Sequence, residues 1–198
     1  PLALGRSRWW TAAAVGTAVA FAMPAGRPAV VLLAPAGVAS ILAVVRALRP
    51  VRTRVGLDDA VRTLAAGWAV VAVGALAASV AGRELFDIGE PIVRLTAVHF
   101  LYAGVGALTV ARRLRAEADR PTPGSAPARP TVVSGTANVA VVATALAPPV
   151  VAVGFVLGAA AAQIGGAVLM TVGVWASALA LLASTNRTPR PGRTLRVV

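Results

Sequence analysis

The stretch TVVSGTANVAVVATALAPPVVAVGFVLGAAAAQIGGAVLMTVGVWASALALLAS, from Thr131 to Ser184, contains no charged residue over 54 positions. A bilayer-spanning helix needs about 20 apolar residues, so this stretch is too long for one span and too short for three spans with their turns. We therefore predict two helices, at 132–157 and 160–184, with the chain reversing near Gly158. Pro148-Pro149 is an alternative point of reversal, because proline interrupts helical hydrogen bonding.

Four further apolar runs precede this stretch, at 9–23, 29–45, 60–82 and 91–111. Unpaired backbone cannot face lipid, so these runs are expected to be helices. We predict an all-α fold in which residues 1–198 form a single integral-membrane domain, a transmembrane helix bundle with about six spans. Residues 116–131 contain four prolines and no apolar period, and they are predicted to be a flexible cytoplasmic linker. The first run also resembles a cleavable secretory signal, which would leave five helices.

The composition agrees with a membrane protein. Apolar residues make up 58% of the chain, the mean hydropathy is +0.79, and 13% of residues are charged, against about 25% in soluble domains. The absence of cysteine excludes disulfides, cysteine-ligated metals and thiol catalysis. One histidine and seven carboxylates argue against an all-protein metal cage. We therefore predict no metal site and no cofactor.

The arginines indicate the orientation of the chain. All 19 basic residues are arginines, and the net charge is +12. Sixteen of them lie on one side of the predicted helices, whereas Arg27 and Arg83 lie on the other side and Arg94 lies within the fourth helix. The positive-inside rule then predicts cytoplasmic N- and C-termini in the plasma membrane. Because these arginines occupy separate loops with few aromatic residues between them, we expect them to contact anionic headgroups on the cytoplasmic side and not nucleic acid.

Two acidic residues, Asp58 and Asp59, lie where the third helix is predicted to begin. Aspartate at a helix start accepts hydrogen bonds from free backbone N–H groups and meets the positive end of the helix dipole. We therefore expect these two side chains to cap the helix.

Polar residues enter the predicted membrane region in GRELFDIGEPIVRLTAVHFLY, from Gly82 to Tyr102. With a rise of ~1.5 Å per residue, His99 lies ~12 Å and Tyr102 ~16 Å below the outer start of the helix. Glu90 and Arg94 are one turn apart and can pair. One interpretation is a binding or proton-transfer site, in which Arg94 contacts an anion and His99 titrates near neutral pH. The other is a helix anchored at the headgroups by Glu90 and Arg94, with a neutral His99 hydrogen-bonded inside the bundle.

Pro148-Pro149 adds a second polar feature, because it frees the carbonyls of Thr144 and Ala145. Thr144 lies roughly 10–12 Å from the outer surface, close to the depth of His99. A transport site and a kink that only shapes the bundle are both consistent with this pattern. Gln163 begins the last helix and would join the cluster. The predicted substrate- or proton-binding residues are Glu90, Arg94, His99, Tyr102, Thr144 and Gln163, and no catalytic residue is predicted.

Three segments resemble the YndJ-like bacterial membrane proteins: PIVRLTAVHFLYAG (Pro91 to Gly104), PPVVAVGFVLG (Pro148 to Gly158) and QIGGAVLMTVGVW (Gln163 to Trp175). The resemblance covers about the second half of the chain and rests chiefly on LTAVHF. It implies a polytopic membrane protein, sometimes labelled a transporter, with His99 as the characteristic histidine. The family pattern has a second histidine two positions later and an acid at the start of the last helix. Leu101 and Gln163 occupy those places here, which weakens any metal or proton-relay role carried over from the family.

The leading hypothesis is a small transporter or permease-like protein for an unknown small molecule or ion, with a polar site in the outer half of the bundle. A non-catalytic assembly subunit, in a homo- or hetero-oligomer, is the first alternative. An intramembrane enzyme that uses His99 as acid or base is the second, and it lacks another convincing catalytic group. An enzyme is therefore the less favoured class.

Overall fold

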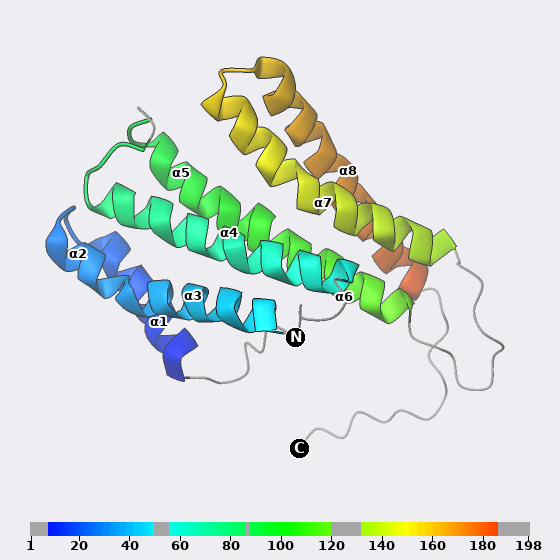
Figure 1. The fold of residues 1–198 in the computed structure, drawn as a ribbon, viewed down its shortest axis with the longest axis horizontal. Coiled ribbons are helices and arrows are strands. Elements are labelled where there is room, and N and C mark those ends of the chain that lie inside the picture. The colour runs from blue at the N-terminus through cyan, green and yellow to red at the C-terminus, as the bar shows by residue number, and fades with distance from the viewer. Residues whose placement is uncertain (1–7, 50–55, 86–87, 120–131, 186–198) are drawn as a thin grey trace.

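The computed structural model describes residues 8–49, 56–85, 88–119 and 132–185, and these residues form helices joined by turns (Figure 1). No strand occurs in these four ranges, where Leu85 and Ile88 form an isolated bridge. The prediction of an all-helical fold is confirmed. The helices are α1 (Arg8–Ala22), α2 (Arg27–Leu32), α3 (Ala34–Leu48), α4 (Leu57–Val80), α5 (Ile92–His99), the π-helix η2 (Phe100–Ala107), α6 (Leu108–Ala118), α7 (Val132–Val156) and α8 (Ala160–Thr185).

Five helical segments are long and apolar enough to cross a membrane: Arg27–Leu48, Leu57–Val80, Ile92–Ala118, Val133–Val156 and Ala160–Ser184. The apolar part of α1, Thr11–Ala22, is shorter. At ~1.5 Å per residue, this part covers less than the ~30 Å of a hydrocarbon core. Five spans therefore follow from length and composition, and a sixth span at α1 stays a prediction.

The reversal between α7 and α8 occurs at Gly158, where the backbone φ is 62°. Glycine adopts this left-handed conformation at little cost because it has no Cβ atom. Helix α7 continues through Pro148 and Pro149, so the alternative reversal at these prolines is not used. Neighbouring helices in a membrane bundle can support such an internal proline.

Helices α5, η2 and α6 form one continuous rod from Ile92 to Ala118. The fourth predicted helix ended at residue 111, and the linker was expected from 116. The structure instead keeps residues 116–118 in α6 and has Asp119 as the C-cap residue, and residues 120–131 of the predicted linker lie outside the described residues. Arg115 near the end of α6 favours this extension, because cations stabilise the C-terminal turn of a helix.

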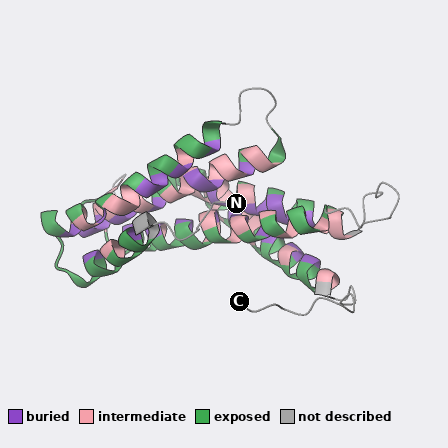
Figure 2. Cartoon of the chain, turned by 90° about the horizontal axis from the view of Figure 1, so that it is seen from below, coloured by how far each residue is buried: buried purple, intermediate pink, exposed green. Residues whose placement is uncertain are grey.

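The buried residues are mainly small ones, and many large apolar residues are exposed. Figure 2 shows buried and exposed positions along the helices. Ala20, Ala72 and Ala140 are fully buried, whereas Trp175 is 66% exposed and Leu182 is 62% exposed. Water would disfavour such a surface, but hydrocarbon does not. Close helix packing through small residues is typical of membrane bundles.

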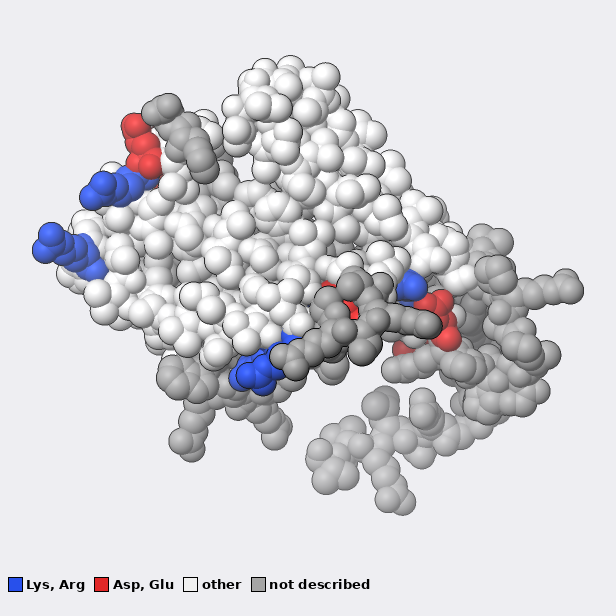
Figure 3. All heavy atoms as spheres, viewed as in Figure 1, with Lys and Arg blue, Asp and Glu red and all other residues white. Residues whose placement is uncertain are grey.

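Charged side chains gather at two ends of the molecule, with an uncharged region between them (Figure 3). The turn end contains the α1–α2 and α4–α5 turns, with Arg27, Arg83 and Arg94. The arginine end contains the last turns of α3 and α6 and the first turn of α4; its described arginines are Arg46, Arg49, Arg62, Arg112, Arg113 and Arg115. At the turn end, the backbone N–H of Gly26 donates to the carbonyl of Val80 at 2.7 Å. This hydrogen bond joins the α1–α2 turn to the end of α4.

Helices α7 and α8 pack along each other over their length, and α7 also contacts α6. Helix α4 is central to the rest of the bundle, where it contacts α3 and the α5–η2–α6 rod. In Figure 1 the α7–α8 hairpin diverges from α4 and α5 as it approaches the turn between α7 and α8.

Candidate functional site

Arg94 of α5 is the best-connected of the predicted site residues. Its Nε donates a hydrogen bond to Oγ of Ser79 on α4 at 3.2 Å and lies 3.9 Å from a carboxylate oxygen of Glu90. Its guanidinium carbon lies 5.7 Å from the ring centre of Phe21 on α1, which permits a cation–π interaction. Ser79 is 2% exposed, whereas the Arg94 side chain is 50% exposed. Three helices therefore meet at a cation that remains accessible.

His99 and Tyr102 lie further along the same rod, and both are exposed. The ring of His99 meets the edge of the Phe100 ring, with 6.0 Å between the ring centres. Tyr102 is 77% exposed. Both residues therefore lie on the outer surface of the helix bundle. The described partners of Arg94 are Ser79, Glu90 and Phe21, and neither His99 nor Tyr102 is among them.

Thr144 and Gln163 belong to the α7–α8 hairpin. Thr144 is 1% exposed and packs against Gly173, where an added Cβ would lie 2.9 Å from the Thr144 backbone nitrogen. Nε2 of Gln163 donates to the carbonyl of Gly154 at 3.2 Å. Both residues thus help to pair the two helices of the hairpin.

The predicted site residues consequently occupy three places. Glu90 and Arg94 are brought together at the turn end, His99 and Tyr102 lie on the exposed surface of the rod, and Thr144 and Gln163 lie within the hairpin. No group of three or more His, Cys, Asp or Glu residues that could hold a metal ion occurs in the described part of the chain. Arg94 is therefore the residue of this set best suited to bind a ligand, because its guanidinium group carries five N–H donors.

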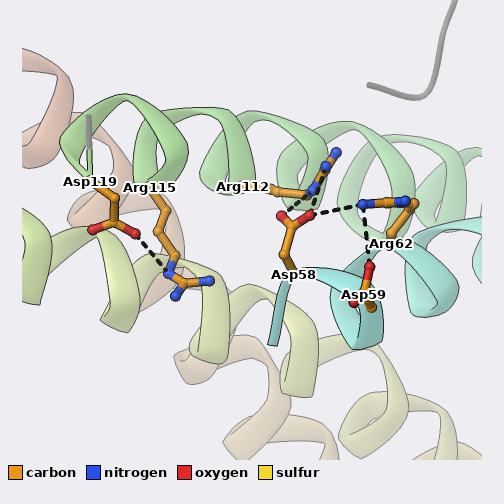
Figure 4. Close-up of polar contacts among 6 residues, drawn as sticks. All are labelled: Asp58, Asp59, Arg62, Arg112, Arg115 and Asp119. Carbon is orange, nitrogen blue, oxygen red and sulfur yellow. Dashed lines mark hydrogen bonds and ion pairs between the residues drawn. The ribbon is translucent and has the colours of Figure 1, made fainter. Parts of the chain in front are cut away.

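A second polar cluster, at the arginine end, was not predicted as a site (Figure 4). Arg112 of α6 donates from Nε to Oδ1 of Asp58 at 2.5 Å and from a terminal nitrogen to Oδ2 at 2.9 Å. Arg62 donates to the same Oδ2 at 3.0 Å and lies 3.3 Å from Asp59. The paired contacts of Arg112 are the bidentate geometry that arginine makes with carboxylates. They join the start of α4 to α6.

This cluster corrects the expectation that Asp58 and Asp59 cap α4. The N-cap residue is Gly56, and no side chain caps the helix. Asp58 accepts hydrogen bonds from Arg112 and Arg62 instead. A charged partner is a stronger donor than a backbone N–H, which explains the change of role. The sequence signal for this ion pair was that Asp58 and Arg112 have opposite charges and are both predicted on the same side of the membrane.

An aromatic contact at η2 was also missed. The rings of Trp68 on α4 and Phe100 stack with their centres 4.7 Å apart and their planes 14° apart. A Cβ added at Gly104 would lie 2.8 Å from Cβ and Cγ of Trp68. Nε1 of Trp68 is buried and has no hydrogen-bond partner among the described residues. Glycine at 104 therefore lets the rod approach α4 closely, and π-helices are frequent at functional sites.

Comparison with known proteins gives a match to a family model. The sequence model of a family described as YndJ-like protein matches residues 3–198. The match extends well beyond the second half of the chain, on which the resemblance in the sequence rests. Neither the curated proteins nor the solved structures give a match.

Proposed function

The chain belongs to the YndJ-like protein family, and from this premise we propose that it is a small permease-like transporter whose solute is an anion contacted by Arg94. The family match and the five long apolar helices indicate a membrane protein. Transport is our inference from the geometry around Arg94. This cation is held in place at a junction of three helices and is still 50% exposed.

Two features of Arg94 support an anion as the solute. Its hydrogen bond to Ser79 and its ion pair with Glu90 both use Nε, at one edge of the guanidinium group. The exposed part of the group can then donate to a carboxylate, phosphate or sulfate oxygen. Glu90 offsets the charge when no solute is bound, and its ion pair with Arg94 is long at 3.9 Å.

The position of the π-helix η2 supports our proposal that α5 moves during transport. It lies between α5, which carries Arg94, and α6, which is joined to α4 through Asp58. Interruptions of α-helical geometry often serve as hinges. We propose that α5 moves relative to α6 at η2, while the arginine end stays fixed.

Uptake by proteoliposomes tests this proposal, with radiolabelled inorganic phosphate, sulfate and acetate as probes. At least one probe should enter faster than into protein-free vesicles, and Arg94→Gln should slow its uptake by about ten-fold, the effect of losing one charged hydrogen bond. Arg113→Gln is the matched control, because Arg113 is exposed at the opposite end of the rod. Equal uptake by the two variants, or no uptake above protein-free vesicles, contradicts the proposal.

His99 is proposed as a proton-binding group of the same cycle, since histidine changes charge between pH 5 and 8. His99→Gln should then remove the pH dependence of uptake in this range without abolishing uptake at the optimum. An unchanged pH profile contradicts this role. Thr144, Gln163 and Tyr102 stay candidate binding residues that this assay tests one at a time.

The proposed topology has six spans, with both termini in the cytoplasm and the arginine end facing cytoplasmic anionic headgroups of the bacterial plasma membrane. Six of the described arginines assigned to the two ends lie at the arginine end and three at the turn end, which supports this topology. Reporter fusions at Gly124 and after Val198 should both report the cytoplasm. A cytoplasmic signal at one position and a periplasmic signal at the other contradicts the topology.

A subunit that assembles with a second copy is the alternative function, and the outer face of α8 is the surface proposed for it. Apolar residues that are all exposed follow one another at helical spacing along this face: Ile164, Val168, Val172, Trp175, Leu179 and Leu182. The chain has no cysteine, so a single Val172→Cys variant offers one site for oxidative cross-linking in membranes. Cross-linked dimers with Val172→Cys, but not with the buried control Ala176→Cys, support assembly through α8. Equal cross-linking of both variants, or of neither, contradicts it.

A further inference from the structure

An apolar groove lies between α2–α3 and α4, and its lining does not include the partners of Arg94, which are Phe21, Ser79 and Glu90. Its volume is about 450 Å³, and its lining includes Val30, Gly37, Ile41, Val70, Val73 and Gly74. The one hydroxyl in the lining, on Ser40, donates to the carbonyl of Gly37 at 2.9 Å. The groove therefore has apolar walls and no unpaired hydroxyl.

Two cations lie near the turn end of this groove. Arg27 begins α2 and is one turn before Val30 and Val31 of the lining. Arg83 follows α4, whose Ala77 also lines the groove, and the hydrogen bond from Gly26 to Val80 joins the two segments. Both arginines are exposed, and no described carboxylate lies within ion-pairing distance of either one. Neither guanidinium group is thus held in a described ion pair beside the apolar groove.

We propose that this groove binds one phospholipid of the leaflet at the turn end, with an acyl chain against α3 and α4 and the phosphate on Arg27 and Arg83. The chemistry matches both parts of the ligand. A methylene chain needs an apolar, hydrogen-bond-free wall, and arginine binds phosphate through paired N–H donors. The side chains of Arg27 and Arg83 are long enough to reach the headgroup region from the helix ends.

The size of the groove favours a lipid chain over a helix of a second copy. Small-molecule sites have volumes of about 300–1,000 Å³, and the groove lies within this range. A partner helix is ~10 Å wide and spans the whole bilayer, which needs a longer and wider surface. The groove is confined to the turn-end half of α4, from Val70 to Ala77. The cations at this end have no role in docking an uncharged helix.

The two groove glycines provide the sharpest variants. A Cβ added at Gly37 or Gly74 meets nothing within 4 Å, so a leucine there fills the groove without displacing backbone. Gly165→Leu is the matched control, since Gly165 on α8 is equally open and lies outside the groove. Thermal unfolding of each variant in detergent verifies that the fold is kept, and Gly37→Leu and Gly74→Leu serve as independent tests of the same groove.

Native mass spectrometry of the full chain, taken from nanodiscs of phosphatidylglycerol and phosphatidylcholine, measures the bound lipid. The wild type and Gly165→Leu should retain one phospholipid, preferably the anionic phosphatidylglycerol, whereas Gly37→Leu and Gly74→Leu should lose it. Arg27→Gln with Arg83→Gln should lower retention by about ten-fold and abolish the preference for phosphatidylglycerol. Inorganic phosphate should not displace the lipid.

Three results overturn the proposal. The first is equal lipid retention by the groove-filled variants and the wild type. The second is displacement by inorganic phosphate alone, which indicates a site for free phosphate. The third is a dimer mass that is lost in Gly37→Leu, which indicates that a second copy occupies the groove. Anion uptake through Arg94 is a separate readout, so failure of either proposal leaves the other distinguishable.

Discussion

The α7–α8 hairpin and the pair formed by α4 and the α5–η2–α6 rod hold their helices together in different ways. The hairpin has no charged residue, and its contacts bring Gly166 and Gly173 of α8 against the backbone of α7. The α4–rod pair uses an ion pair at one end, an aromatic stack in the middle and Arg94 at the other end. Close approach of small residues and specific polar contacts are therefore both used in one bundle.

The comparison teaches where movement is expected. Small-residue contacts extend along the whole hairpin, so separating α7 from α8 loses many contacts together. The polar and aromatic contacts of α4 with the rod occur at three separate points, and η2 lies between the Asp58–Arg112 ion pair and Arg94. The rod can therefore change at one end without losing its contact at the other.

The largest expected effect comes from breaking the hairpin with Gly173→Leu. An added Cβ would lie 2.9 Å from the backbone nitrogen of Thr144, so α7 and α8 must separate. We expect a loss of about 3 kcal/mol or more in the free energy of unfolding, the upper range for an overpacked core. Unfolding in mixed detergent micelles measures it. Gly165→Leu is the control on the open side of α8, and equal losses for both variants would show that Gly173 has no special place in the hairpin.

The next effect comes from the arginine end of the other pair. Asp58→Ala removes the partner of Arg112, whose side chain is 16% exposed, and should cost about 2 kcal/mol. We place it below the cost of breaking a fully buried pair because the Asp58 side chain is 43% exposed. Asp59→Ala is the control, because Asp59 contacts only Arg62 among the described ion pairs, and it should cost less than about 1 kcal/mol. In an Arg112→Gln background the cost of Asp58→Ala should fall, and a constant cost would contradict the pairing.

A smaller loss is expected from Gly104→Ala, which tests the aromatic contact at η2. The added methyl would meet Cβ and Cγ of Trp68 at 2.8 Å, and these atoms are too close to the backbone to move freely. The expected cost is about 1–2 kcal/mol, with a change in tryptophan fluorescence. Gly106→Ala is the control, because its nearest contact is an ordinary 3.5 Å. Unchanged fluorescence in Gly104→Ala would mean that η2 does not need this close approach.

The smallest effect, with the opposite sign, is expected at Gly67 in α4. No atom lies within 4 Å of an added Cβ there, so alanine should stabilise the helix by about 0.5–1 kcal/mol. The same unfolding assay measures it. A loss of stability in Gly67→Ala would contradict this expectation.

Much of the fold could be predicted because apolar length alone decides where helices cross lipid. The uncharged stretch predicted α7, α8 and the reversal at Gly158, which the structure confirms. The sequence could not predict which of 19 glycines face another helix, because that depends on the rotation of each helix about its axis. Gly173 and Gly165 are on the same helix, and one is in close contact while the other is open.

The candidate site could likewise be predicted only in part from the sequence. The pairing of Glu90 with Arg94 follows from their spacing within one turn, so it could be inferred locally. Equal depth in the membrane did not place His99 beside Thr144, since depth says nothing about which neighbour a side chain faces. The partner of Asp58 lies 54 residues away, and a helix-start signal close to it in sequence suggested a cap instead.

The self-contained pairing of α7 with α8 has a consequence for biosynthesis. These helices leave the ribosome after α1–α6, and they carry no charge that could orient them against the helices already inserted. Their direction of insertion is then expected to depend on the arginines that flank them, with Arg129 before the hairpin and Arg187 after it. The hairpin can enter the bilayer as one preassembled unit and dock onto α6, which was synthesised just before it.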